Sequence, residues 1–105
     1  MQPVINESNF AADVYDAQGK VLVEFFATWC PHCQRQQPIT DAAAADLSFP
    51  VYQVDVDKSP QLADEYAANG FPTYVLFDNG KPVAEHTGEW PLPNLLAFAR
   101  EAVSA

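Results

Sequence analysis

The feature that most constrains this chain is a pair of cysteines, Cys30 and Cys33, placed where a strand-like segment gives way to a helix-like one. They are the only two cysteines among 105 residues. Residues 21–27 form a nearly continuous apolar run, which is typical of a strand buried on both faces of a sheet. A helix-forming stretch begins at Pro31. A C-x-x-C pair at such a junction indicates a dithiol redox centre, in which one thiol attacks a disulfide and the other resolves the mixed disulfide.

Length and composition predict one folded domain over residues 1–105. Hydrophobic residues make up 49% of the chain, enough for a core that needs no metal or disulfide staples. The net charge of -9 argues against binding to nucleic acid or to an anionic membrane surface, because both depend on basic patches. The acidic balance fits a soluble protein that meets other proteins transiently. We expect the protein to be a monomer.

The first residues carry neither the basic region nor the apolar region of an export signal. No stretch approaches the ~20 apolar residues of a membrane span. These two observations lead us to expect a cytoplasmic location.

The periodicity of apolar residues predicts an α/β protein. We expect strands at residues 4–5, 21–27, 51–56, 73–77 and 82–87, and helices at about residues 8–19, 31–47, 60–70 and 91–103. Ser8 and Ser59 are the expected N-caps of the first and third helices, and Pro38 should kink the second helix without ending it. For the last helix we expect a buried face made of Leu95, Leu96, Phe98, Ala99 and Ala102. The β-α-β order implies parallel strands, and a closing hairpin at residues 78–81 adds an antiparallel edge.

Several separated motifs resemble the thioredoxin family over roughly residues 9–102. Residues 23–30 resemble its strand leading into W-C-x-x-C, residues 70–73 its cis-proline loop, residues 77–80 its hairpin, and Gly88 its substrate-groove glycine. The C-x-x-C pair alone would be a weak signal, whereas its combination with Pro72-Thr73 is specific. The resemblance implies the thioredoxin fold, with a central mixed five-stranded sheet flanked by four helices.

Cys30 is the expected nucleophile. It precedes the helix at Pro31, where unpaired backbone N–H groups and the helix dipole stabilise a thiolate. Cys33, one turn later, is the expected resolving thiol and should be the less exposed of the two. The alternatives are an inert structural disulfide and a metal site, although a metal needs about four ligands and only the two cysteines, His32 and the distant His86 are available. We expect no cofactor beyond the redox-active disulfide Cys30–Cys33.

His32 stands between the cysteines and is expected to set the redox poise. A hydrogen bond or positive charge from His32 would stabilise the Cys30 thiolate and make the disulfide a stronger oxidant. Reducing members of the family usually carry Gly-Pro at these two positions, whereas Pro31-His32 resembles a periplasmic oxidant branch in that tetrapeptide only. The alternative is a solvated His32 that tunes nothing.

Glu24 is a carboxylate inside the apolar run, and burial there should raise its pKa. The family has an acidic residue here, usually Asp, which is assigned as the proton acceptor for the resolving thiol. Gln53 occupies the position where the family often has a buried Lys. Without that cation Glu24 should be harder still to ionise. The alternative is a Glu24 that reaches solvent at a sheet edge.

The resemblance also implies a docking surface for extended peptide segments. Pro72 would be cis and would present the backbone of Phe71 to a substrate, a trans turn being the alternative. The apolar patch around Cys30 would consist of Trp29, Pro31, Phe71, Pro72 and Gly88. Glu89 makes the edge of this groove more acidic than is usual in the family. We expect His86 to be an exposed strand residue, and Tyr66, Trp90 and Phe98 to be core or scattered surface.

The resulting hypothesis is an enzyme: a thiol–disulfide oxidoreductase that reduces protein disulfides and carries electrons in cell redox homeostasis, with a less reducing poise than ordinary thioredoxins. Its partners would be disulfide-containing client proteins and a thioredoxin-reductase-like electron donor. Two alternatives stay open: an exported disulfide oxidant or isomerase, and a redox-switched binding module.

Overall fold

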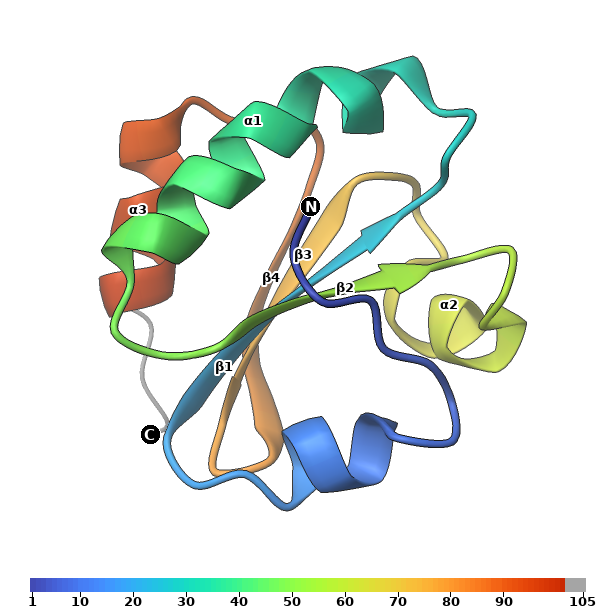
Figure 1. Ribbon diagram of the computed structural model, residues 1–105, viewed down its shortest axis with the longest axis vertical. Coiled ribbons are helices and arrows are strands. Elements are labelled where there is room, and N and C mark those ends of the chain that lie inside the picture. Colours follow the sequence, from blue (N-terminus) through green and yellow to red (C-terminus); the bar gives the residue numbers. More distant parts are fainter. Residues whose placement is uncertain (102–105) are drawn as a thin grey trace.

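The computed structural model describes residues 1–101 (Figure 1). Its elements are η1 (Ala11–Tyr15), β1 (Lys20–Phe26), α1 (Pro31–Asp46), β2 (Val51–Asp55), α2 (Pro60–Tyr66), β3 (Thr73–Asp78), β4 (Lys81–Thr87) and α3 (Leu92–Glu101). The strands form one mixed sheet in the order β2-β1-β3-β4. Strand β1 runs parallel to β2 and antiparallel to β3, and β3 and β4 form the closing hairpin.

From Val21 to Phe25, the apolar residues of β1 alternate between two halves of the core, as the two-residue period of a strand requires. Val23 and Phe25 pack in a cluster that includes side chains of η1 and α2. Leu22 packs in a second cluster with side chains of α1 and α3. Figure 1 shows α1 and α3 next to each other, away from η1 (the blue helix) and α2. The buried β1 therefore ends between two helical layers, and its carboxyl end leads into the cysteine pair.

The prediction of a fifth strand at residues 4–5 is wrong. Val4 makes a single parallel bridge to Gln53, supported by the N–H of Ile5 donating to the Gln53 carbonyl at 2.9 Å. Pro3 has no N–H to extend the ladder. On the other side, the side chain of Asn6 accepts from the N–H of Ser8 at 2.9 Å and turns the chain away. The sheet therefore has four strands among the described residues, and the mixed α/β architecture is otherwise as expected.

The first helix differs from its prediction in type and in cap. Residues 11–15 form a π-helical turn, in which the N–H of Asp16 donates to the carbonyl of Ala11 at 2.8 Å. Ser8 does not cap it, because its hydroxyl donates to the side chain of Asn6 at 2.6 Å. Local side-chain bonds of this kind compete with helical capping.

The other helices agree with the sequence in position and differ at their ends. Helix α1 continues through Pro38 to Asp46, so this proline does not end it. Ser59 is the N-cap residue of α2, but its hydroxyl makes no capping hydrogen bond, and α2 ends at Tyr66 rather than near Gly70. In α3 Leu95 and Ala99 are buried, and Leu96 and Phe98 are partly buried against the same cluster. The predicted contributions of residues 102 and 103 lie outside the described residues.

Within residues 1–101, no helix has the length and apolar character needed to cross a membrane.

Candidate active site

The two cysteines lie where β1 gives way to α1. Cys30 has an extended backbone conformation and is the N-cap residue of α1, and Pro31 occupies the first helical position. The N–H of Cys33 donates to Cys30 Sγ at 3.3 Å, so the sulfur takes the place that a capping oxygen usually fills. Both cysteines are free thiols. The structure thus holds the pair in its reduced form, with one sulfur at a helix N-terminus.

The cysteines differ in electrostatics and not in exposure. Each cysteine residue is 4% exposed, so the expectation that Cys33 is the less exposed of the two is wrong. Burial, and then the neighbouring Cys30, raise the pKa of Cys33 to about 12, and the charge of Glu24 acts in the same direction. Cys30 instead has an N–H donor aimed at its sulfur. The geometry therefore gives the sulfur of Cys30 a backbone hydrogen-bond donor and favours a protonated thiol on Cys33.

The loop before β3 brings the predicted docking residues beside Cys30. The Phe71–Pro72 peptide bond is cis, as predicted. The carbonyl oxygen of Phe71 lies 4.0 Å from Cys30 Sγ, at the limit of a weak S–H···O contact. The N–H of Gly88 donates to the Pro72 carbonyl at 2.8 Å, which ties the end of β4 to this loop. The structure therefore places the Phe71 carbonyl beside Cys30 and joins Gly88 to the same loop through the buried Pro72.

Trp29 completes this surface from the other side. It is 61% exposed and meets the ring of Phe71 edge-on, with 6.0 Å between ring centroids. Its indole Nε1 donates to Asp57 at 2.8 Å, which fixes the ring orientation. Asp57 was missed in the sequence, although it follows β2 and the carboxyl ends of parallel strands meet at one edge of a sheet. Pro31 is also exposed here. An exposed aromatic beside a nearly buried thiol suits the docking of a peptide segment.

Glu24 is fully buried, at 0% exposure, so the prediction of a buried carboxyl is confirmed. Burial raises its pKa to about 7, against hydrogen bonds from Thr40 and Gln53 that lower it. Thr40 donates to Glu24 Oε1 at 3.0 Å and Gln53 at 2.9 Å. The other oxygen, Oε2, is buried and has no partner among the described residues. An orphan oxygen and a pKa near 7 describe a carboxyl that holds and releases a proton near neutral pH.

A polar network leads from Glu24 toward the surface, and most of its members were missed in the sequence. Gln53 and Gln37 bond reciprocally through their amides at 2.9 and 3.0 Å. Gln37 also donates to Asp41 at 3.0 Å. The sequence gives no sign that these polar residues of α1 and β2 interact. Gln53 reaches Glu24 because the register between β1 and β2 places the two opposite each other.

His32 does not bond to Cys30 in the structure. Its Nδ1 lies 2.6 Å from Glu89 Oε2, and Arg35 Nη2 lies 2.9 Å from the same nitrogen. Arg35 donates to both oxygens of Glu89, at 3.0 and 2.8 Å. These contacts, first with Arg35 and then with His32, lower the pKa of Glu89 to about 2. Arg35 was missed in the sequence, although it lies three residues after His32 and therefore on the same helix face.

The expectation that His86 is exposed is wrong. Its ring stacks on Trp90, with centroids 3.4 Å apart and planes 1° apart, and its Nε2 is buried without a partner in the described part of the chain. Burial lowers its pKa. An edge-strand residue would face water, but Trp90 follows Gly88 closely enough for its side chain to fold back over His86.

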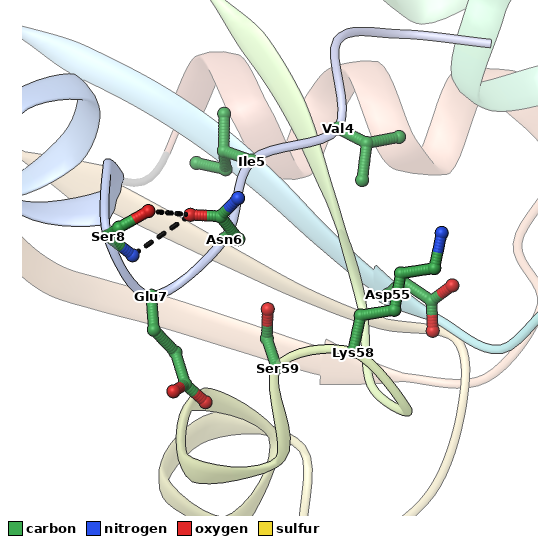
Figure 2. A pocket seen from close by; sticks show the side chains of 8 residues that line it. All are labelled: Val4, Ile5, Asn6, Glu7, Ser8, Asp55, Lys58 and Ser59. Carbon is green, nitrogen blue, oxygen red and sulfur yellow. Dashed lines mark hydrogen bonds between the residues drawn. The ribbon is translucent and has the colours of Figure 1, made fainter.

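A hollow of about 550 Å³ lies away from the cysteines, between the N-terminal segment and the start of α2 (Figure 2). The hydroxyl of Ser59 points into it. The two carboxylates there have backbone partners: Glu7 accepts from the N–H of Gln61, and Asp55 from the N–H of Asp57. No cluster of three or more His, Cys, Asp or Glu side chains suited to a metal occurs within residues 1–101.

Comparisons with known proteins agree with this geometry. The family model "Thioredoxin" matches residues 2–101. A thioredoxin of Chlamydia trachomatis serovar D is 39% identical over 89 residues, covering 84% of this chain and 85% of that protein. The "Protein disulfide isomerase-like 2-3" of Oryza sativa subsp. japonica is 41% identical over 102 residues, but these span 95% of this chain and only 23% of the plant protein.

Among solved structures, a mutant thioredoxin from Halobacterium salinarum NRC-1 is similar, with a TM-score of 0.86 and 29% identity over 98% of this chain and 91% of that one. A dithiol at the start of α1, beside a cis-proline loop on a mixed sheet, defines the class of thiol–disulfide oxidoreductases. The chain belongs to the thioredoxin family.

Proposed function

We propose that the protein reduces disulfide bonds in client proteins, with Cys30 as the nucleophile and Cys33 as the resolving thiol. The observation that carries this proposal is the N–H of Cys33 donating to Cys30 Sγ at the first turn of α1. That donor and the helix dipole stabilise negative charge on Cys30 alone. Cys33, with its raised pKa, stays protonated until a base removes its proton.

The first step is attack by the Cys30 thiolate on one sulfur of a client disulfide. The client S–S bond breaks as the new S–S bond to Cys30 forms, and the released client thiolate takes up a proton from solvent. The client segment would lie along the loop at Phe71 and Pro72, between Trp29 and Gly88. Backbone pairing with that loop would supply affinity without demanding a particular client sequence.

In the second step Cys33 loses its proton and attacks Cys30 Sγ. The bond between Cys30 and the client breaks, the second client sulfur leaves as a thiolate that takes up a proton from solvent, and the protein holds the disulfide Cys30–Cys33. We assign Glu24 as the proton acceptor in this step. Its unpartnered Oε2 and its pKa of about 7 suit a base that is partly ionised at neutral pH. The charge of Glu24 also contributes to the raised pKa of Cys33, which supports their coupling.

The cycle needs a donor of two electrons to reduce the disulfide again. In this proposal the donor is a thioredoxin-reductase-like flavoprotein. A protein named "Bifunctional thioredoxin reductase/thioredoxin" from Mycobacterium leprae is 35% identical to this chain over 86 residues, which supports such a pairing. The compartment would be the cytoplasm, where thiols are kept reduced. His32 would make the poise less reducing than that of a Gly-Pro protein.

Reduction of insulin with dithiothreitol as electron donor tests this function. The wild-type protein should accelerate the precipitation of insulin chains, and Cys30→Ser should abolish the acceleration. A wild-type protein that binds insulin but leaves its disulfides intact would contradict the proposal and favour a binding module. The assay also excludes an inert structural disulfide, since such a bond would not turn over.

The second candidate function is disulfide oxidation or isomerisation. It is favoured by Pro31-His32 between the cysteines and by the similarity to a protein disulfide isomerase-like chain. Equilibration with glutathione buffers decides between the two directions. A reductant should have a potential near that of thioredoxin, about -270 mV, and an oxidant or isomerase one near -180 to -120 mV, on the order of the known examples.

A further inference from the structure

The cluster of Glu89, His32 and Arg35 lies beside the cysteine pair and has no part in the steps described above. We propose that Glu89 is a positioning residue that holds His32 by Nδ1 and neutralises Arg35, and that it thereby lowers the reduction potential. This inference rests on the proposed dithiol chemistry and adds a control of its poise.

The contact between Glu89 and His32 fixes the role of each imidazole nitrogen. A carboxylate only accepts hydrogen bonds, so the 2.6 Å contact between Nδ1 and Glu89 Oε2 is a hydrogen bond when Nδ1 carries the proton and donates it. Arg35 Nη2, which lies 2.9 Å from the same nitrogen, then donates to Glu89 Oε2 at 2.8 Å and not to Nδ1. Glu89 therefore determines the tautomer and the direction of His32, in the same way that a carboxylate orients a metal-bound histidine. The imidazole is directed toward Glu89, and no hydrogen bond reaches Cys30 Sγ from it within the described residues.

The contact between Glu89 and Arg35 determines the charge that Cys30 experiences. Arg35 reaches Glu89 through Nε and Nη2, a bidentate pairing of the kind that gives a defined geometry even at a surface. Glu89, by its hydrogen bond and charge, raises the pKa of Arg35, and the charge of Cys30 adds to this effect. Arg35 and the Cys30 thiolate therefore attract one another.

The sign of the effect follows from these charges. A cation near Cys30 stabilises the thiolate, hence the reduced protein, and raises the potential. Glu89 places a negative charge on the two groups that could do this, and so opposes them. The other ionisable groups near the two cysteines include Glu24 and Tyr74, which both interact with Cys33, and Asp57, which accepts from Trp29. Glu89 bonds to His32 and Arg35 and not to these groups, so its charge can be removed without disturbing them.

The test is the equilibrium with glutathione at pH 7 for the full chain and its variants. Glu89→Gln should shift the equilibrium toward the reduced protein by about fivefold, which is about 20 mV at roughly 29.6 mV per tenfold change. Arg35→Gln should shift it in the opposite direction, and the double variant should lie between the two. Glu85→Gln is the matched control, because it makes the same change at an exposed residue of β4, which pairs with Val75 of β3. It should leave the potential unchanged.

A nitrogen-15 NMR spectrum of His32 supplies a second readout. If Glu89 had only a structural role, its replacement would not change the position of the proton on the imidazole. The wild-type protein should show the proton on Nδ1, and Glu89→Gln should redistribute it toward Nε2. If the wild-type protein reduces insulin while Glu89→Gln matches its potential, this inference is overturned and the proposed function stands. If the wild-type protein fails to reduce insulin, the proposed function itself is wrong.

Discussion

Gln53 donates a 2.9 Å hydrogen bond to the buried carboxyl of Glu24, from the position directly opposite it on β2. An amide satisfies one oxygen but brings no charge, so it offsets only part of the cost of burying a carboxylate. This explains why the pKa of Glu24 is raised to about 7. The first two predictions follow from this pair.

Glu24 should make the protein less stable as the pH rises. Its pKa is 4.5 in the reference state and about 7 in the folded protein, so the folded state binds the proton more tightly than the unfolded chain. Stability from this residue is therefore fully present below about pH 4.5 and is lost as the pH rises to about 7. The difference amounts to about 3 kcal/mol at roughly 1.36 kcal/mol per pKa unit.

Urea unfolding of wild type and Glu24→Gln at pH 5 and pH 8 checks this. The variant should be more stable than wild type by about 3 kcal/mol at pH 8 and much closer to it at pH 5. Glu85→Gln serves as the control for an exposed carboxylate. A stability difference that is the same at both pH values would contradict the assignment of a raised pKa.

A cation in place of Gln53 should bring the pKa of Glu24 back toward that of an ordinary carboxyl group. Gln53→Lys places an ammonium group next to Glu24, and an adjacent opposite charge lowers the pKa of a carboxyl, by about 1–3 units in typical cases. The measurement is an NMR titration of the side-chain carboxyl carbon of Glu24 in the wild-type protein and in Gln53→Lys. A wild-type carboxyl that titrates near ~4.3 would show that Glu24 is solvated.

His32 should still raise the potential, although Glu89 holds it away from Cys30. An imidazole next to the thiolate adds partial positive charge even without a direct hydrogen bond. His32→Gly should make the protein more reducing, by up to about 30 mV, or tenfold in the glutathione equilibrium. An unchanged potential would leave His32 as a solvated residue that tunes nothing. Comparison with Glu89→Gln separates the effect of the imidazole from that of its carboxylate partner.

Trp29 should matter for protein substrates and not for small ones. Its exposed ring, held by Asp57, offers apolar area to a docking segment. Trp29→Ala should lower kcat/KM for insulin about tenfold, corresponding to ~1.4 kcal/mol of lost contact, and leave the reduction of a small disulfide such as hydroxyethyl disulfide nearly unchanged. Equal losses for both substrates would place the role of Trp29 in the thiol chemistry instead of in docking.

The sequence predicted those features that local pattern determines. The apolar run of β1, the helix starting at Pro31 and the buried Glu24 follow from residue type and period alone. The prediction of a short strand at Val4 was wrong because Pro3 and Asn6 end the pairing after one bridge. A two-residue apolar pattern does not reveal such an end. Element ends such as that of α2 depend on packing and are poorly defined by composition.

Features that depend on distant contacts could not be predicted. Glu89 is recognisable as an unusual acidic residue after Gly88, but its pairing with Arg35 requires the end of β4 to lie beside the first turns of α1. The stacking of His86 on Trp90 likewise reverses the usual outward direction of an edge-strand residue. The pairing of Glu89 with Arg35 arises from the tertiary structure, whereas the stacking of His86 on Trp90, four residues later, depends on how the chain turns after β4.

The central claim is that Cys30 attacks and Cys33 resolves, and trapping of mixed disulfides tests it most directly. Cys33→Ser and Cys30→Ser should each be incubated with an oxidised model peptide and analysed by intact mass and peptide mapping. We predict that Cys33→Ser accumulates a peptide adduct on Cys30, because nothing resolves it, and that Cys30→Ser accumulates almost none, because burial keeps Cys33 protonated. Equal adduct formation by both variants would contradict the claim.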